Sequence, residues 1–516
     1  MTDSNTNHTI ALIVILTMGA FFIRLPGLET RPMHGDEANQ AYKTGILLEQ
    51  GKYVYDPRDH HGPTLYYLTL IPAFLSSADS FEKTRETTYR IVPLIFGAGL
   101  IAVTLLLRPA FSTRALIASA LLVAISPAFV FYSRYYIQET LLVFFTLAAI
   151  GFGSRFIQAP SIKRGIALGA SLSLMHATKE TAIIAYISMF AGLCAVFAAN
   201  RNSDTVAELR KSITPRQIVA LVATALTINI LLYTAFFTNL RGPLDSILTY
   251  SNYLKRSDGA GLHDKPWYYY VQLLVYTNKG PKYWFSEALP VALGSLGILI
   301  ALHQTRMRRA HPLILFLAVY TLVMILIYSV IPYKTPWTML SLYHGLLLLA
   351  GYAVAVIAEK LKNVPAESIC ALLLLAGLSH LAYQTYLTNH VIPADPRNPY
   401  VYAHTSSAHL DLIDRVYGIQ AIHPDPDSMS VKIIQPDNDY WPLPWYLRKI
   451  EHVGFYPEIP ESPDADVIIA APSLRTTLAE KLSDDYQLEI GGLRPSVLRA
   501  VYIKRELWDA YMETRK

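Results

Sequence analysis

Two adjacent carboxylates follow the first long apolar stretch of the chain, in Gly35-Asp36-Glu37-Ala38. About 20 apolar residues suffice to cross a bilayer, so Asp36 and Glu37 are expected at a membrane surface. Ionisable groups there are costly unless they are solvated, paired or functional. Such a carboxylate can act as a general base that removes a proton from a hydroxyl group. The alternative is structural: Asp36 caps a helix that runs from Glu37 to Gln50 and is closed by Gly51.

Cationic and aromatic residues recur in the short connections between later apolar runs. The candidates for binding an anionic group are Arg134, Lys179, Tyr333, Lys334 and Trp337. Glu139, in the same connection as Arg134, is a second candidate for acid–base chemistry. Each cation also has a structural alternative. Arg134 can pair with Glu139, Lys179 can mark a hairpin turn, and Lys334 can be an interfacial anchor.

Two neighbouring histidines, His60 and His61, precede a Gly-Pro turn in the first polar segment. Together with Glu37 and Glu139, one of these histidines offers nitrogen and oxygen ligands for a divalent metal ion. The alternative is that both are polar loop residues. A divalent ion is therefore a candidate cofactor, and no other cofactor is indicated.

Composition determines the class of protein that must position these residues. Of 516 residues, 52% are hydrophobic and 16% are charged, and the mean hydropathy is +0.29. These values exclude an ordinary soluble protein and predict a polytopic membrane protein. The net charge of +5 needs no nucleic acid to explain it, because lysines and arginines cluster in short loops. The two cysteines, Cys194 and Cys370, lie in apolar segments and predict neither a disulfide framework nor a thiolate metal site.

Apolar runs predict about eleven membrane spans. The runs are 10–28, 88–107, 115–131, 140–157, 165–177, 181–199, 217–237, 288–302, 312–331, 337–357 and 366–387. The first run lacks the basic flank of a cleavable signal and is expected to remain as an anchor. The segment 63–77 is apolar but about half a membrane thick, so it is expected to lie along the surface or to re-enter it.

Basic residues give the orientation. One alternating set of connections contains, among others, Arg108, Arg114, Lys163 and Arg164, and is expected to be cytoplasmic. The carboxylates and the candidate cations then share the outer face, provided that 63–77 does not span.

The composition changes near Asn389, where hydropathy falls. Short strands are predicted at 431–434, 467–470 and 486–490, with helical stretches near 440–449 and 474–482. The predicted domains are a membrane domain at 1–388, with outer loops at 29–87 and 239–287, and a small extracytoplasmic α/β domain at 389–516. The protein is expected in the plasma membrane.

Carboxylates and cations on the outer face of the membrane suit the transfer of a sugar from a lipid-phosphate donor to an acceptor. Cationic side chains stabilise the charge that develops on the phosphate as the glycosidic bond breaks. A carboxylate near the acceptor hydroxyl removes its proton during attack on the anomeric carbon. The donor arrives by lateral diffusion in the bilayer.

The order of these segments resembles that of the GT-C class of membrane glycosyltransferases. The resemblance is carried by the first span, the loop with Gly35-Asp36-Glu37-Ala38, and His61-Gly62-Pro63-x-x-x-Tyr67. The nearest types are the dolichyl-phosphate-mannose protein mannosyltransferases and the aminoarabinose transferases. The chain also resembles a prokaryotic branch labelled flippase-activity-associated, through residues 133–139, 178–181 and 333–337.

This resemblance implies a fold of about eleven spans with amphipathic helices on the outer face, and an inverting transfer of a hexose or pentose. Asp36 matches the catalytic base, Glu37 its acidic neighbour, and Glu139 an acidic group that supports a metal ion or the acceptor. The residues implied to bind the lipid phosphate are Arg134, Lys179 and Lys334. The partners are a polyprenyl-phosphate-linked donor, the bilayer, and a protein, glycan or lipid acceptor. The alternative is a non-catalytic accessory protein or a translocator of lipid-linked sugars.

Overall fold

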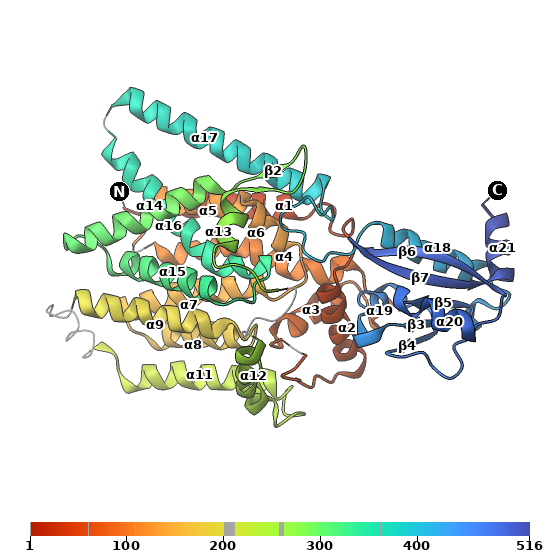
Figure 1. Ribbon diagram of the computed structural model, residues 1–516. Helices are drawn as coiled ribbons and strands as arrows, with labels where there is room; N and C mark the ends of the chain where they lie inside the picture. Colours follow the sequence, from red (N-terminus) through yellow and green to blue (C-terminus); the bar gives the residue numbers. More distant parts are fainter. Residues whose placement is uncertain are drawn as a thin grey trace.

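A bundle of long helices forms one part of the molecule and a small α/β domain the other, as the computed structural model shows (Figure 1). The structure describes residues 2–59, 61–108, 110–200, 212–256, 263–361 and 363–515. The predicted ligand His60 lies outside these residues. The bundle part contains α1 (Thr2–Arg24), α2 (Gly35–Gln50), α3 (Thr64–Leu75), α4 (Glu86–Val103), η1 (Thr104–Leu107), α5 (Thr113–Ile125), α6 (Pro127–Ser133), α7 (Glu139–Gln158), α8 (Ile162–His176), α9 (Ala182–Ala199), α11 (Pro215–Tyr233), α12 (Gly242–Arg256), α13 (Tyr269–Val275), β1 (Thr277–Asn278), β2 (Trp284–Phe285), α14 (Ala288–Arg306), α15 (Pro312–Val330), η2 (Pro336–Thr338), α16 (Met339–Lys360), α17 (Val364–Tyr386) and η3 (Leu387–Val391).

Among the described residues, nine helices are long and apolar enough to cross a membrane, or ten if α5 and α6 form one bent span. The predicted number of about eleven also includes the run at 165–177, which forms α8. With 15 residues, α8 is shorter than the helices in this count. It nevertheless packs between α7 and α11, where it buries small residues such as Gly165 and Gly169.

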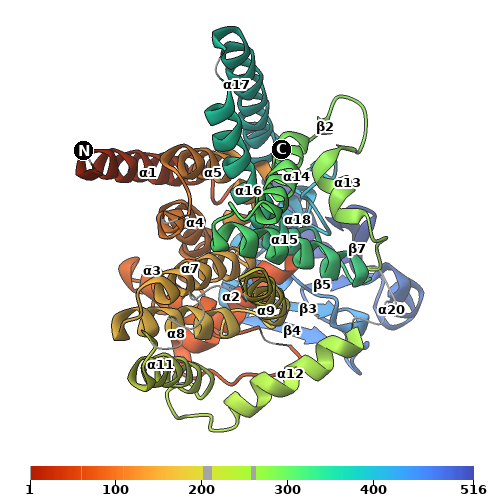
Figure 2. The same ribbon diagram turned by 90° about the vertical axis from the view of Figure 1, so that its left-hand side faces the viewer.

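The centre of the bundle is α16, which packs against α5, α14 and α15. Gly294 and Gly297 of α14 face the backbone of α16, where a Cβ on either glycine would clash with a carbonyl oxygen. Small residues thus let these two helices approach closely. By contrast, α1 and α17 lie on the periphery, and most of their side chains are exposed (Figure 2). In the bilayer these exposed apolar residues meet lipid.

Residues 29–87 contain α2 and α3, which lie at the end of the bundle that meets the C-terminal domain (Figure 1). The apolar segment 63–77 becomes the 12-residue α3, which is too short to span. It packs against α2 and α4. The prediction that this segment does not cross the membrane therefore agrees with its length.

The C-terminal domain is built on one five-stranded sheet with strand order β4-β3-β5-β7-β6. Strand β3 pairs in parallel with β4 and β5, and β7 pairs antiparallel with β5 and β6. Its elements are α18 (Ala408–Ile422), η4 (Pro426–Ser428), β3 (Ser430–Ile434), η5 (Pro436–Asn438), α19 (Leu443–Tyr446), β4 (His452–Tyr456), β5 (Val467–Ala470), η6 (Pro472–Leu474), α20 (Arg475–Lys481), β6 (Tyr486–Arg494), β7 (Val497–Lys504) and α21 (Arg505–Glu513). The three predicted strands are β3, β5 and β6. The helix predicted near 440–449 shrinks to the single turn α19, which begins after Pro442.

The C-terminal domain contacts the loop that contains Asp36. The Tyr446 hydroxyl accepts a hydrogen bond from the backbone N–H of Met33 at 2.8 Å, and the Thr405 hydroxyl donates to the Met33 carbonyl at 2.7 Å. The indole N–H of Trp445 donates to Glu86 at 3.2 Å. The domain therefore lies on the same side of the bundle as Asp36.

A buried glutamate connects the bundle to the segment that leads into this domain. Glu287 accepts hydrogen bonds from Ser126 Oγ (2.6 Å), the N–H of Ala128 (3.0 Å), and the hydroxyls of Tyr343 (2.7 Å) and Tyr400 (2.6 Å). Ser126 lies at the 60° bend between α5 and α6. Three separate segments thus converge on one carboxylate.

Replacing Glu287 is expected to destabilise the bundle. In Glu287→Ala the four donors lose their buried acceptor, and each unsatisfied group costs about 1–3 kcal/mol. The melting temperature in detergent should fall well below that of the wild type, whereas Glu359→Ala, at an exposed glutamate of α16, should not change it. Equal melting temperatures for the two variants would contradict this structural role.

Candidate active site

The start of α2 is capped by a histidine. His34 Nδ1 accepts the backbone N–H of Asp36 at 2.9 Å, and the Glu37 carboxylate accepts the N–H of His34 at 3.1 Å. The alternative reading of Asp36 as the cap is therefore wrong, and the cap lies two residues earlier. Gly51 ends the helix as predicted, in the left-handed conformation with φ of 62°. Because His34 caps the helix, the Asp36 side chain is free for another role.

Glu37 is fully buried and is the centre of an ion cluster. Arg90 donates to both of its oxygens at 2.8 Å, Arg31 donates at 3.2 Å, and the N–H of Tyr136 donates at 2.9 Å. Burial alone would raise the pKa of Glu37, but the two guanidinium groups and the hydrogen bonds lower it to about 2. Glu37 thus stays ionised. Its oxygens are occupied, which favours a structural role over the predicted catalytic or metal-binding one.

Arg90 also fixes the loop that precedes α2. Its guanidinium donates to the carbonyl oxygens of Leu28 (2.6 Å), Arg31 (2.8 Å) and Pro32 (3.2 Å). One side chain of α4 therefore holds both the loop and the first turn of α2. The position of Asp36 follows from this contact.

The side chain of Asp36, unlike that of Glu37, is exposed. Its side chain is 53% exposed, and its nearest ionisable partner is His34, with 3.9 Å between Oδ2 and Nδ1. Nδ1 of His34 already accepts a hydrogen bond, so its proton is on Nε2, which donates to the Tyr402 carbonyl at 3.1 Å. Burial lowers the pKa of His34 and keeps it neutral. Among the described residues, no cation pairs with the Asp36 carboxylate.

Aromatic rings surround His34 and extend away from it. Trp337 contacts the His34 ring at 5.9 Å and the Tyr402 ring at 5.9 Å between centroids. The Tyr402 hydroxyl and His263 Nδ1 are 3.0 Å apart, and the Tyr333 ring lies 4.6 Å from the His263 ring. We call Asp36, His34, Trp337, Tyr402 and His263 the Asp36 cluster. The structure thus brings the predicted residues Trp337 and Tyr333 to the same region as Asp36.

Two buried polar atoms next to this cluster have no hydrogen-bond partner in the described part of the chain. They are the Tyr135 hydroxyl and Nε2 of His404. The two rings stack at 5.3 Å, and both contact the His34 ring. Because Nδ1 of His404 accepts the N–H of Tyr402 at 2.9 Å, Nε2 carries the proton. Two hydrogen-bonding groups are therefore available beside Asp36.

Lys334 is buried behind the cluster and connects two loops. Its Nζ donates to the carbonyls of Lys265, at 3.2 Å, and Ile331, and its backbone N–H donates to the His263 carbonyl at 2.9 Å. Lys265 was not predicted, yet its Nζ lies 5.9 Å from the centre of the Tyr402 ring. Lys265 is therefore the lysine next to the Asp36 cluster.

Arg134 is held by backbone carbonyl groups. Its guanidinium donates to the carbonyls of Asn389 (2.9 Å), Gly27 (2.8 Å) and Pro26, so it joins the end of α1 to η3. Burial and the nearby Arg31 and Arg90 lower its pKa to about 9. The structure shows no direct contact between Arg134 and the Asp36 cluster.

The remaining predicted residues form two separate pairs. Lys179 pairs with Glu139 inside the protein, and His61 Nδ1 lies 2.9 Å from Glu180 Oε2. Within the described ranges, no three His, Cys, Asp or Glu side chains are close enough to hold a metal ion. The proposed ligands Glu37, Glu139 and His61 thus do not fit a shared ion, because each has its own partner.

Sequence reasoning missed His34, His263, Lys265, Tyr402 and His404. His34 could have been found as an alternative cap, since it directly precedes Gly35. The others lie in the long loop and in the linker to the C-terminal domain. No local pattern marks them, because their proximity to Asp36 arises only in the folded chain.

Comparisons with known proteins place this geometry in a known fold. The family described as "Dolichyl-phosphate-mannose-protein mannosyltransferase" matches residues 80–233, a range that includes Arg90, Arg134 and Lys179 but not Asp36. No curated protein matches the chain. The matched range covers the helices that hold the loop rather than the loop itself.

Solved structures match over nearly the whole chain. ArnT from Cupriavidus metallidurans, crystallised with undecaprenyl phosphate, has a TM-score of 0.65 at 15% identity and covers 96% of this chain and 97% of its own. The archaeal oligosaccharyltransferase AglB from Archaeoglobus fulgidus, in complex with an inhibitory peptide and a dolichol-phosphate, has a TM-score of 0.56 at 13% identity over 98% of this chain and 77% of that chain. The same oligosaccharyltransferase is also known in complex with Zn and sulfate. The chain thus has the GT-C fold of membrane glycosyltransferases, as its resemblance implied. The narrower resemblance to the flippase-activity-associated branch stays a prediction.

The Glu37 ion cluster gives a pH dependence of stability. The folded pKa of about 2 lies below the ordinary value of 4.5, so the stabilisation is present above about pH 4.5 and is lost as the pH falls toward 2. The shift corresponds to about 3 kcal/mol. Glu37→Gln should lower the melting temperature at pH 7 and flatten its decline between pH 5 and 3, as measured in detergent. The control Glu82→Gln, at an exposed glutamate, should retain the decline of the wild type. The same decline in Glu37→Gln would contradict the assignment.

Proposed function

We propose that this chain is a glycosyltransferase that moves a sugar from a polyprenyl-phosphate-linked donor to an acceptor on the outer face of the membrane. The observation that carries the proposal is the half-exposed, cation-free carboxylate of Asp36 beside an aromatic cluster. The class of donor is supported by the undecaprenyl phosphate bound to ArnT and the dolichol-phosphate bound to AglB.

Asp36 is the general base in this proposal. A carboxylate without a paired cation is free to take a proton from an acceptor hydroxyl. The acceptor oxygen then bonds to the anomeric carbon, and the bond between that carbon and the phosphate oxygen breaks. The phosphate leaves with the electron pair. Attack opposite the leaving phosphate inverts the configuration at the anomeric carbon.

The groups beside Asp36 suit the donor. The buried hydroxyl of Tyr135 and Nε2–H of His404 can donate to sugar or phosphate oxygens. Trp337 belongs to the Asp36 cluster, and an indole is a suitable aromatic surface for packing against a sugar ring. Lys265 lies beside the Tyr402 ring and can stabilise negative charge on the departing phosphate. Lys334, which was predicted for this role, is held by the carbonyls of Lys265 and Ile331 and supports the loop that carries Lys265. Arg134 and Lys179 are engaged by protein groups, so they support the fold of the site in this scheme.

The orientation follows from charge. Arg108, Arg114, Lys163 and Arg164 lie at the ends of helices remote from α2, and basic residues are retained in the cytoplasm. Asp36 and the C-terminal domain contacting its loop then face outward. The protein is accordingly a multi-pass protein of the plasma membrane.

Asp36→Asn is expected to abolish transfer, because the amide keeps the size of the side chain but cannot take a proton at neutral pH. Loss of a general base lowers the rate by at least about 100-fold. The measurement compares envelope glycans and lipid-linked sugars in cells lacking the protein and in cells complemented with wild type, Asp36→Asn or Asp79→Asn. Asp79 is the control, since its exposed carboxylate lies in the same loop and pairs only with Lys83 among the described residues.

Deletion should leave a lipid-linked sugar unused and a glycan incomplete. Wild type and Asp79→Asn should restore the glycan, whereas Asp36→Asn, present in equal amount in the membrane, should not. Restoration by Asp36→Asn would remove Asp36 from the mechanism. A lipid-linked sugar that stays on the inner leaflet in the deleted cells, with Asp36→Asn restoring its movement, would instead favour the translocator.

A further inference from the structure

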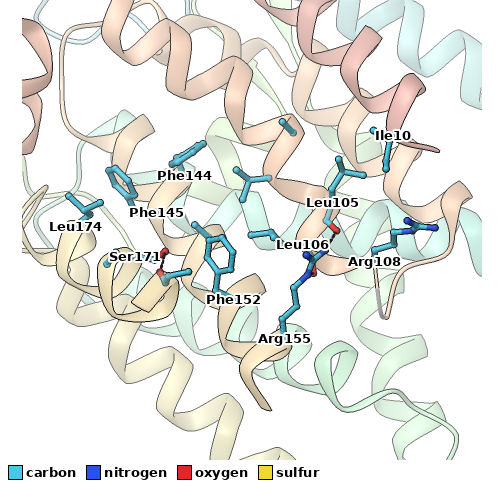
Figure 3. Close-up of a pocket in the computed structure, with 15 residues that line it drawn as sticks. Ile10, Leu105, Leu106, Arg108, Phe144, Phe145, Phe152, Arg155, Ser171 and Leu174 are labelled. Carbon is cyan, nitrogen blue, oxygen red and sulfur yellow. Dashed lines mark hydrogen bonds between the residues drawn. The ribbon is translucent and has the colours of Figure 1, made fainter. Parts of the chain in front are cut away.

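A second site lies at the other end of the bundle, in an open cavity between α4, α7 and α8. Its volume is about 760 Å³. The apolar part of its wall includes Leu106, Phe144, Phe145, Phe152 and Leu174 (Figure 3). A cavity of this size is large enough for a sizeable apolar ligand. Inside a bilayer, such a space opens to lipid.

Two arginines line one end of this cavity. Arg155 donates through Nε to the Leu106 carbonyl at 3.2 Å and through Nη2 to the Leu105 carbonyl at 2.8 Å. Arg108 bonds to the Thr6 hydroxyl. Figure 3 shows both arginines at one end and Phe144, Phe145 and Leu174 at the other. The cavity is therefore amphipathic along its length.

No carboxylate among the described side chains, those of residues 2–5 excluded, pairs with the positive charge at this end. Neither Arg108 nor Arg155 pairs with a carboxylate, and neither does Arg164, whose Nη1 lies 3.4 Å from the Arg155 carbonyl. Arg155 belongs to the last turn of α7 and lines the cavity. Cations left unpaired beside an apolar cavity favour a ligand that has both an anionic group and hydrocarbon.

We propose that this cavity binds an anionic glycerophospholipid of the cytoplasmic leaflet, with its phosphate on Arg108 and Arg155 and an acyl chain along Phe144, Phe145 and Phe152. Basic pockets between helices on the cytoplasmic side are suited to such head groups. Arg155 keeps Nη1 for the phosphate after its two carbonyl contacts, and a guanidinium binds phosphate oxygens with good geometry.

The position of the cavity separates this ligand from the proposed donor. Glu139 begins α7 close to Tyr136, which contacts Glu37, and Arg155 lies 16 residues further along. At 1.5 Å per residue, this spacing places Arg155 about 24 Å from Glu139 along the helix. A phosphate on Arg155 therefore does not reach Asp36. The site stands independently of transfer activity.

The test uses the full-length protein with Phe152→Trp as a reporter in the cavity. The protein is reconstituted in phosphatidylcholine vesicles that contain a minor fraction of phosphatidylglycerol, with bromine on the acyl chains of one lipid at a time. Quenching of the native tryptophans is measured in the protein without Phe152→Trp and is subtracted. Bromine on phosphatidylglycerol should quench the reporter more than its share of the bilayer predicts, and Arg108→Gln and Arg155→Gln should each weaken this preference about fivefold.

Arg114→Gln is the matched control, because Arg114 is exposed at the same end of the bundle but does not line the cavity. It should retain the preference. Arg108→Gln loses a hydrogen bond to the Thr6 side chain, whereas Arg155→Gln loses two contacts with backbone carbonyls, so Arg108→Gln keeps the test valid if Arg155→Gln does not fold. Quenching in proportion to bilayer composition would overturn the proposal, as would an equal effect of Arg114→Gln. Displacement of the brominated lipid by polyprenyl phosphate would also overturn it, because the occupant would then be the donor lipid.

Discussion

The structure depends on neutralising one buried carboxylate. Glu37 would be very costly inside the protein without partners, yet Arg90 and Arg31 surround it and the N–H groups of Tyr136 and His34 complete its hydrogen bonds. These partners come from α4, the first loop, the segment before α7 and the cap of α2. One ion cluster therefore fixes four segments in register, and Asp36 projects from the first turn of α2 because its neighbour is held.

The C-terminal domain and its linker complete the site, on the side of the Asp36 loop that faces away from the helix bundle. Tyr446 and Thr405 hold the backbone of Met33, and the Tyr402 carbonyl holds the ring of His34. His404, from the same linker, stacks on Tyr135 of the bundle. The small sheet domain is thus not an appendage, since its linker forms part of the wall beside Asp36. Variation in this linker is a physical route by which the acceptor or the sugar could be selected.

The two ends of the bundle have different chemistry. At the end near α2, carboxylates, histidines and aromatic rings are closely packed, and polar atoms are buried. At the other end, arginines lie around a cavity lined by phenylalanines and leucines. An anionic lipid bound there would fix the depth of α4 and α7 in the membrane, and α4 carries Arg90. The lipid site and the ion cluster are then connected through one helix.

Local sequence patterns predicted the helices and strands better than they predicted the contacts between them. Apolar runs predicted most of the long helices, and short runs of strand-forming residues predicted β3, β5 and β6, because burial in a bilayer or a sheet leaves a local signal. The run at 165–177 also predicted a helix, the short α8. Asp36 could be singled out from its place after the first span. Arg90, the partner of Glu37, could not be predicted, because it lies 53 residues away within an apolar run.

Contacts between distant segments left no signal at all. His34 and Tyr402 are 368 residues apart and meet only when the C-terminal domain docks. The contacts of the predicted cations left no signal for a related reason. Arg134 and Lys179 were correctly placed near helix ends, but buried carbonyl groups and Glu139 satisfy them inside the protein. A single sequence does not distinguish a cation held by protein groups from one left free for a ligand.

The most direct measurement of the central claim is an experimental structure of the protein in a lipid nanodisc with bound polyprenyl phosphate. The account predicts the phosphate next to the Asp36 cluster, with the Asp36 carboxylate facing it and Glu37 still held by Arg90. A phosphate bound at the opposite end of the bundle, or an Asp36 carboxylate turned away and paired with a cation, would contradict it.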